Sequence, residues 1–176
     1  MWLDSKEISH WAYEYCIEVK DRPGIRKNIT DSFWAYNYCR DINDDPEIRK
    51  NIIRNSDAYG YCKNVKDRSE IRKLINTSFW GCDYCQNIKD DPEVRKYINI
   101  SKDAYWYCRG VEDRPEIRKY INNSEWSYWY CKHIKNRHEI RKNITESCWA
   151  FKYCQYVKDD PEIRKYIQRE TNVVRT

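Results

Sequence analysis

The sequence predicts an all-α solenoid of seven tandem helix-turn-helix repeats, each 23 residues long. The first observation is a cysteine column at a fixed spacing: Cys16, Cys39, Cys62, Cys85, Cys108, Cys131 and Cys154. The second is that the seven copies follow one another without insertion or deletion from about Ser9 to Ile167. The third is that the apolar residues of each copy recur at helical spacing. A fixed period in this range is typical of repeat proteins, in which each repeat packs on its neighbours.

The repeats predict a single domain over residues 1–176. We expect residues 1–8 to form an N-terminal cap through Trp2, Leu3 and Ile8, and residues 9–167 to form the repeats. Residues 168–176 are expected to be a polar tail. Neither terminal repeat has the polar outer face usual for capping repeats, so self-association through the solenoid ends is one expectation.

The first helix of each repeat is expected to begin at a column of small polar residues that act as N-caps. This column is Ser9, Ser32, Asn55, Ser78, Ser101, Ser124 and Ser147. About ten residues follow, and at about 100° per residue Ala35, Tyr38, Cys39 and Ile42 share one face. These four positions are the predicted core of the helix.

The second helix is expected to begin at an Asp-x-Pro-Glu sequence, as in residues 44–47, with the glutamate completing a capping box. Two apolar residues four apart, such as Ile48 and Ile52 or Ile117 and Ile121, then face inward. The helix has barely two turns. Helices this short are marginal alone, so stacking must supply their stability.

The nine cysteines are interpreted as free thiols. Equivalent positions of stacked helices lie about 8–10 Å apart, whereas a disulfide needs Cα atoms within about 7 Å. We therefore expect small buried hydrophobes in a reducing compartment. No signal-peptide pattern or membrane-spanning run is found, and the cytoplasm, that of a host cell if the protein is viral, is the expected location.

The aromatic motif resembles a known repeat family. Residues 11–19 read Trp-Ala-Tyr-x-Tyr-Cys-x-x-Val, and residues 22–25 read Arg-Pro-x-Ile. This pattern is similar to the Trp-Ala-Tyr-x-Tyr-Ala helical repeats of bacteriophage and large-DNA-virus proteins. The chain departs from them in its Cys, its shorter period and its Ile-Arg-Lys second helix. The resemblance implies the helical fold and a phage or viral origin, with a role on host machinery, but lends no site.

Enzymatic chemistry is not indicated. His10, His133 and His138 occupy three different repeat positions, and no nucleophile–base–acid arrangement can be built from them. Cys82 and Cys85 have a metal-ligand spacing, but zinc needs about four ligands and no second pair is near. We expect no cofactor and no metal.

An Arg-Lys pair recurs in every repeat, from Arg26-Lys27 to Arg164-Lys165. One interpretation is a basic stripe for nucleic-acid phosphates. The favoured interpretation is structural, with each arginine lying on aromatic rings and pairing with Asp and Glu. A further column, the junction column, changes sign and is expected to form pairs between neighbouring repeats: Arg22, Asp45, Arg68, Asp91, Arg114, Arg137 and Asp160.

Repeats five and six carry the candidate site. At the position after the motif tyrosine, which should face solvent, they hold Trp106 and Trp129, followed one turn later by Arg109 and Lys132. The site as predicted is completed by three more residues: His133, Arg114 and Arg137. Residues 101–144 contain ten Lys and Arg against six Asp and Glu, a net charge of +4 out of +5 for the chain. Trp106 has a second interpretation, as the filler of a gap left where Asp103 replaces the usual Trp.

Exposed tryptophans among cations are typical of protein-interface hot spots and of base-stacking platforms. The leading hypothesis is a non-catalytic scaffold that binds a host or viral protein, with inhibition of host defence as one such role. The first alternative is binding or sequestration of a nucleic acid or nucleotide. The second alternative is structural self-assembly. No membrane partner is expected.

Overall fold

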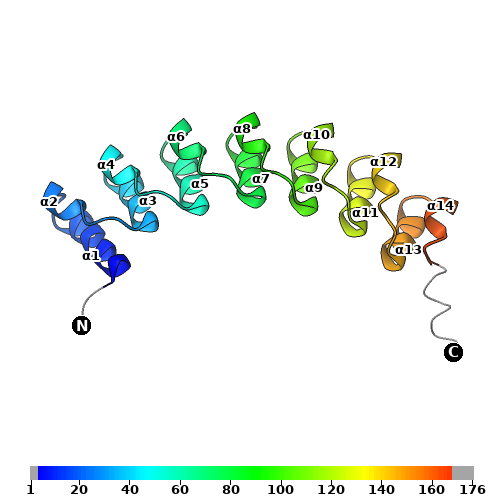
Figure 1. Cartoon of the computed structure of the whole chain (residues 1–176), viewed down its shortest axis with the longest axis horizontal. Helices are drawn as coiled ribbons and strands as arrows, with labels where there is room; N and C mark the ends of the chain where they lie inside the picture. The colour runs from blue at the N-terminus through cyan, green and yellow to red at the C-terminus, as the bar shows by residue number, and fades with distance from the viewer. Residues whose placement is uncertain (1–3, 168–176) are drawn as a thin grey trace, which may run out of the picture. The chain divides into compact units, whose positions relative to one another are not determined.

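The computed structural model describes residues 4–167, which form fourteen helices and no strand (Figure 1). It divides into two compact units, Met1–Tyr97 and Ile98–Thr176. Within each unit, neighbouring long helices pack on one another. The predicted α-solenoid of seven helix pairs is therefore confirmed.

Each repeat consists of a long helix and a short one. The long helices are α1 (Ser5–Glu18), α3 (Ser32–Asp41), α5 (Asn55–Asn64), α7 (Ser78–Asn87), α9 (Ser101–Gly110), α11 (Ser124–His133) and α13 (Ser147–Tyr156). The short helices are α2 (Pro23–Arg26), α4 (Pro46–Arg49), α6 (Ser69–Arg72), α8 (Pro92–Arg95), α10 (Pro115–Arg118), α12 (His138–Arg141) and α14 (Pro161–Arg164).

The chain start differs from the expected cap. Asp4 and Glu7 form a capping box, so α1 begins at Ser5 and Ser9 lies inside it. Ile8 belongs to the first turn and is 42% exposed, so it does not pack as a cap residue. Trp2, Leu3 and the tail 168–176 lie outside the described residues.

The short helices combine one α-helical turn with a tighter second turn. In α4 the amides of Asn51 and Ile52 bond to carbonyls three residues back, at 2.9 and 3.0 Å. Asp45 caps this helix by accepting from the Glu47 amide at 2.8 Å. The expected capping box is wrong here, because Glu47 pairs with Lys50 instead.

The core follows the predicted face. The second tyrosine of each motif is fully buried from repeat two onward: Tyr38, Tyr61, Tyr84, Tyr107, Tyr130 and Tyr153. Ala35, Cys39, Ile48 and Ile52 are buried as expected, whereas Ile42 at the end of α3 is only half-buried.

All nine cysteines are free. Burial raises the pKa of Cys62 to about 12, as it does for the equivalent thiols Cys39, Cys85, Cys108 and Cys131. These side chains therefore stay protonated and act as small apolar residues, as the spacing argument predicts.

A polar cluster joins successive repeats at each buried tyrosine. The Tyr61 hydroxyl donates to Asp44 of the preceding repeat at 2.8 Å, and Arg49 donates to the same carboxylate at 2.6 Å. The same contact joins Tyr38 to Asp21, Tyr84 to Asp67 and Tyr130 to Asp113. We call this arrangement the Tyr–Asp–Arg junction. Burial of the phenol requires an acceptor, and the aspartate supplies it.

The arginine of the Arg-Lys pair thus has the structural role favoured from the sequence. The junction column also ties repeats together, but its members do not pair with each other as expected. Arg68 reaches back to Asp44 at 2.7 Å, and Arg137 reaches back to Asp113 at 3.0 Å. Asp45, Asp91 and Asp160 instead form ion pairs with the arginine of the preceding Arg-Lys pair.

The serine column was predicted to cap its own helix, and this is wrong. The N-cap of α3 is Asp31, which accepts from the Phe33 and Trp34 amides at 3.0 and 3.4 Å. The buried Ser32 hydroxyl instead accepts from the Ile53 and Arg54 amides of the next inter-repeat loop, at 3.0 and 3.1 Å. Ser9 and Ser124 make the same pair of contacts. The serine therefore fastens one repeat to the next.

Removing this fastening should destabilise the fold. Ser32→Ala leaves two part-buried amides without an acceptor, so we expect a loss of about 1–3 kcal/mol in the free energy of unfolding. Urea denaturation followed by circular dichroism measures it. Ser69→Ala, at an exposed serine that begins α6, should change stability by less than about 0.5 kcal/mol. Equal effects of the two substitutions would refute the role given to Ser32.

The Tyr–Asp–Arg junction should make stability depend on acid pH. Burial by itself raises the pKa of Asp67, but bonds from Arg72 and Tyr84 outweigh it and lower that pKa below its ordinary value. Asp67 therefore adds stability above its unfolded pKa of about 3.9, and this stability is lost as the pH falls through the lower folded pKa.

Asp67→Asn tests this dependence, because Asn136 already accepts from Tyr153 at 3.0 Å in repeat six. We expect a loss of about 1–2 kcal/mol at pH 7 and a shrinking difference from the parent protein below about pH 4. Thermal melts across pH measure both. Asp159→Asn, at a side chain 62% exposed, should leave the melting temperature nearly unchanged. A difference that persists at low pH would contradict the argument.

Candidate functional site

An aromatic pocket of about 300 Å³ lies between α9 and α11 of the second unit. We use the name aromatic pocket for the site lined by Tyr105, Trp106, Arg109, Trp126, Trp129 and His133. Four of these residues belong to the predicted site: Trp106, Arg109, Trp129 and His133. Because the repeats stack in register, equivalent positions of successive long helices lie side by side.

Trp106 is the exposed wall of the aromatic pocket. It is 40% exposed and meets Tyr105 edge-on, with ring centroids 5.2 Å apart. The Arg109 guanidinium lies 5.3 Å from the Trp106 ring centroid. Since Asp103 is itself buried and Trp106 stays exposed, Trp106 does not act as a buried replacement for the missing Trp. The exposed indole is therefore accessible to a ligand.

The position after the motif tyrosine does not face solvent in every repeat, as the sequence had suggested. Asn37 is buried and donates to the Phe33 carbonyl at 2.8 Å. Trp129 is half-buried and stacks on His133, with centroids 5.1 Å apart and planes at 11°. Trp129 therefore shapes the pocket wall as well as presenting surface.

A directed hydrogen-bond chain crosses the aromatic pocket. Arg109 Nη1 donates to the Tyr105 hydroxyl at 3.0 Å, and that hydroxyl lies 3.2 Å from His133 Nδ1. Arginine can only donate, so the tyrosine oxygen accepts from it, and the contact between Tyr105 and His133 completes the chain.

The electrostatics favour the neutral form of the His133 ring. Desolvation lowers its pKa below the ordinary value, and the positive charges of Arg109 and Lys132 lower it further. The ring is therefore uncharged near pH 7. The pocket offers aromatic faces, one guanidinium edge and one neutral imidazole.

Lys132 lies beside the aromatic pocket without lining it. Its ammonium is 5.4 Å from the Trp129 ring centroid and 5.1 Å from the Tyr156 ring centroid. It adds positive charge to the rim next to Trp129.

Arg114 and Arg137 were predicted to belong to the site, but the structure places neither in the pocket. Arg114 donates to the Tyr107 hydroxyl at 3.1 Å and pairs with Glu112 at 2.5 Å. Arg137 donates to Tyr130 and Asp113, each at 3.0 Å. Both are held in contacts within the chain, because the junction column runs along the Tyr–Asp–Arg junctions.

Tyr105 and Trp126 were not predicted as site residues. Tyr105 packs against Trp126 with centroids 5.3 Å apart, and the two form one wall. These contacts follow a constant sequence offset. Tyr13 and Tyr36 each contact a residue 28 positions later, Asp41 and Asn64 respectively. The same offset leads from Tyr105 to His133.

Among residues 4–167, no group of three or more His, Cys, Asp or Glu side chains could hold a metal ion. Cys82 and Cys85 are both buried. The expectations of no metal, no cofactor and no catalysis stay predictions.

An apolar pocket of about 270 Å³ lies at α1, lined by Ile8, Trp11, Ala12, Tyr15, Ile25 and Asn28. Trp11 is 63% exposed. This surface is the kind that end-to-end self-association would use, and that alternative stays a prediction.

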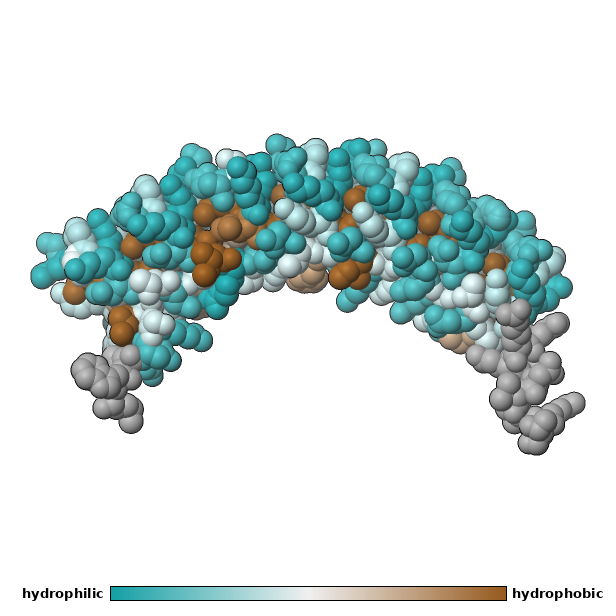
Figure 2. Space-filling model, in the orientation of Figure 1, coloured by the Kyte–Doolittle hydropathy of each residue, from teal (hydrophilic) through white to brown (hydrophobic). Residues whose placement is uncertain are grey.

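The visible surface of each unit is mainly hydrophilic, with hydrophobic residues in separate patches (Figure 2). Within the described part of the chain, none of the helices has the length and apolar character needed to cross a membrane.

Comparisons with known proteins add no relative. No protein-family model matches the sequence, and no match was found among curated proteins or solved structures. Function is therefore inferred from the geometry of the aromatic pocket.

The state of His133 can be measured directly. We expect its pKa, followed by nuclear magnetic resonance of the ring protons, to lie below the ordinary histidine value of about 6.5. Lys132→Gln removes one nearby positive charge and should move this pKa upward. A pKa at or above about 6.5 in the unaltered protein would contradict the pocket electrostatics.

Proposed function

We propose that this chain is a non-catalytic scaffold that binds a protein partner through the aromatic pocket. The supporting observation is the convergence of Trp106, Trp126, Trp129 and Tyr105 on one cavity of about 300 Å³. A partner would insert an apolar or aromatic side chain between these rings. Buried aromatic anchors of this kind carry much of the affinity in protein interfaces.

The polar groups of the pocket suit such an anchor. Arg109 is a donor at its edge, so it would orient an acceptor of the partner, such as a main-chain carbonyl. Lys132 on the rim would favour a nearby carboxylate and speed association. The pocket is largely pre-organised, because stacking and the hydrogen-bond chain hold its walls.

Binding of a nucleic acid or nucleotide is the second candidate, since the same rings would stack bases. Less supports it, because two of the cations expected to meet phosphates, Arg114 and Arg137, are engaged within the chain. Affinity that falls steeply with salt would favour this candidate over the first.

The resemblance to phage and viral repeats extends the proposal. The partner would then be a host or viral protein in the host cytoplasm, and inhibition of host defence is one process that such binding would serve.

Selection of peptides from a random display library on the immobilised protein tests the proposal. We expect enriched peptides that carry an apolar or aromatic anchor. Trp106→Ala should weaken their binding by at least about tenfold, because it removes the exposed wall of the pocket. Trp129→Ala should abolish binding while leaving helicity nearly unchanged. Isothermal calorimetry measures the affinities.

Phe151→Ala is the matched control, since Phe151 is an exposed aromatic on α13 outside the pocket. It should leave the affinity unchanged. Enriched peptides that bind Trp106→Ala and Trp129→Ala normally would overturn the proposal. Recovery of no peptide, together with salt-sensitive binding of oligonucleotides, would move the second candidate to first place.

A further inference from the structure

The lysine of the Arg-Lys pair has two states in this chain. In three repeats it pairs with the glutamate three residues before it: Lys50 with Glu47, Lys96 with Glu93 and Lys165 with Glu162. In the other four, no ion pair joins Lys27, Lys73, Lys119 or Lys142 to another described residue.

The charge of the junction-column residue distinguishes the repeats with a paired lysine from those with an unpaired lysine. The paired lysines occur in the repeats that hold Asp45, Asp91 and Asp160. There the junction aspartate takes the arginine of the preceding repeat, as Asp91 takes Arg72 at 2.9 Å. The glutamate is left for its own lysine.

In two repeats whose junction residue is arginine, the glutamate contacts the preceding repeat instead. Glu70 lies 3.8 Å from Arg49, and Glu139 lies 3.8 Å from Arg118. Glu139 also lies 3.8 Å from Arg137 of its own repeat. Lys73 and Lys142 are then left without a carboxylate partner. Lys27 has Gly24 at the glutamate position, and no ion pair joins Lys119 to Glu116.

The alternation of the junction column breaks once, at Arg114 and Arg137. Repeats five and six therefore both leave their lysine unpaired, so Lys119 and Lys142 are unpaired neighbours. Elsewhere in the described chain, a repeat with a paired lysine separates the unpaired ones. Both lysines are exposed.

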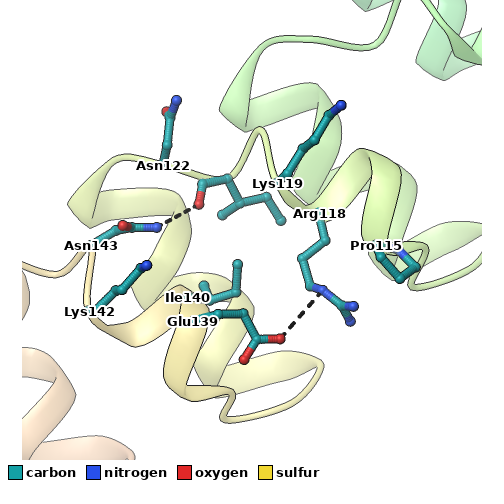
Figure 3. Close-up of a pocket in the computed structure, with 9 residues that line it drawn as sticks. Pro115, Arg118, Lys119, Asn122, Glu139, Ile140, Lys142 and Asn143 are labelled. Carbon is teal, nitrogen blue, oxygen red and sulfur yellow. Dashed lines mark hydrogen bonds and ion pairs between the residues drawn. The ribbon is translucent and has the colours of Figure 1, made fainter.

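These two lysines border a groove of about 480 Å³ between α10 and α12, on a different set of helices from the aromatic pocket. Figure 3 draws its lining, with Lys119 and Lys142 on neighbouring repeats and Arg118 reaching across to Glu139. The buried side chains of Ile121 and Ile140 also line it. The groove thus combines apolar lining with two unpaired cations.

Two asparagines add directed polar groups to the groove. Asn143 donates its side-chain NH₂ group to the Ile121 carbonyl at 3.0 Å, so its side-chain oxygen can still accept a hydrogen bond. The Asn122 oxygen accepts from Ser101 at 2.8 Å, so its NH₂ group is the end left to donate. An acceptor and a donor on adjacent repeats match the groups that a peptide backbone presents.

We propose that this groove binds an acidic, extended peptide segment of a partner protein. Its carboxylates pair with Lys119 and Lys142, and its backbone meets Asn122 and Asn143. A peptide is favoured over a nucleic acid because Asn122 and Asn143 offer the donor and the acceptor that match a peptide backbone. The proposal is independent of the aromatic pocket.

Fluorescence anisotropy with a labelled peptide of alternating glutamate and alanine tests this assignment. We expect binding that the double variant Lys119→Gln/Lys142→Gln weakens by about tenfold, the product of two partly exposed ion pairs. The control Lys27→Gln/Lys73→Gln removes the same charge from the same column at unpaired lysines that are not neighbours. It should change the affinity by less than about twofold, because only long-range attraction is lost.

Three outcomes would overturn the proposal. The first is absence of peptide binding to the unaltered protein. The second is an equal loss in the two double variants, which would indicate net charge alone. The third is an oligothymidylate of equal charge that binds more tightly than the peptide with the same dependence on Lys119 and Lys142, which would assign the groove to nucleic acid. Circular dichroism checks that both variants remain folded.

Discussion

The hydrogen bond from a buried tyrosine hydroxyl to the aspartate of the preceding repeat is the contact on which this architecture depends. A phenol cannot be buried without an acceptor, and Asp44 supplies one to Tyr61 from outside its own repeat. The same carboxylate takes Arg49, so the single-turn α4 is tied to the junction. Helices of four residues have no stability of their own, and these contacts add register to the apolar stacking.

Because these junctions pair many of the charged side chains, they determine which charged groups remain available to bind a partner. Arginines such as Arg49 and Arg118 are paired within the junctions, although the sequence suggests that they could form a basic stripe. The groups that remain are those that depart from the repeat pattern. Trp106 and Trp129 form walls of the aromatic pocket, and no ion pair joins Lys119 or Lys142 to another described residue. The two candidate binding surfaces are thus formed at irregular positions of a regular scaffold.

The sequence predicted local, regularly spaced features better than contacts between distant residues. Trp106, Arg109, Trp129 and His133 could be grouped from sequence, because helical spacing and repeat register are local and regular. Arg114 and Arg137 do not line the pocket, because they bond to Tyr107 and Asp113, contacts that spacing alone does not reveal. The serine column misled for a related reason. A serine at N-cap and one at the next position look alike in sequence, and only the loop packed above Ser32 shows which bond it makes.

The sequence alone determined the repeat length, the helix pair, the buried faces and the free cysteines, since each follows from periodicity and from burial of apolar side chains. The tertiary structure decided which acceptor each buried donor takes, and therefore which cations are consumed. It also decided that Tyr105 and His133, which lie 28 residues apart in the sequence, contact each other. Choices between competing partners depend on distances of a few tenths of an ångström, which a pattern of residue types does not contain.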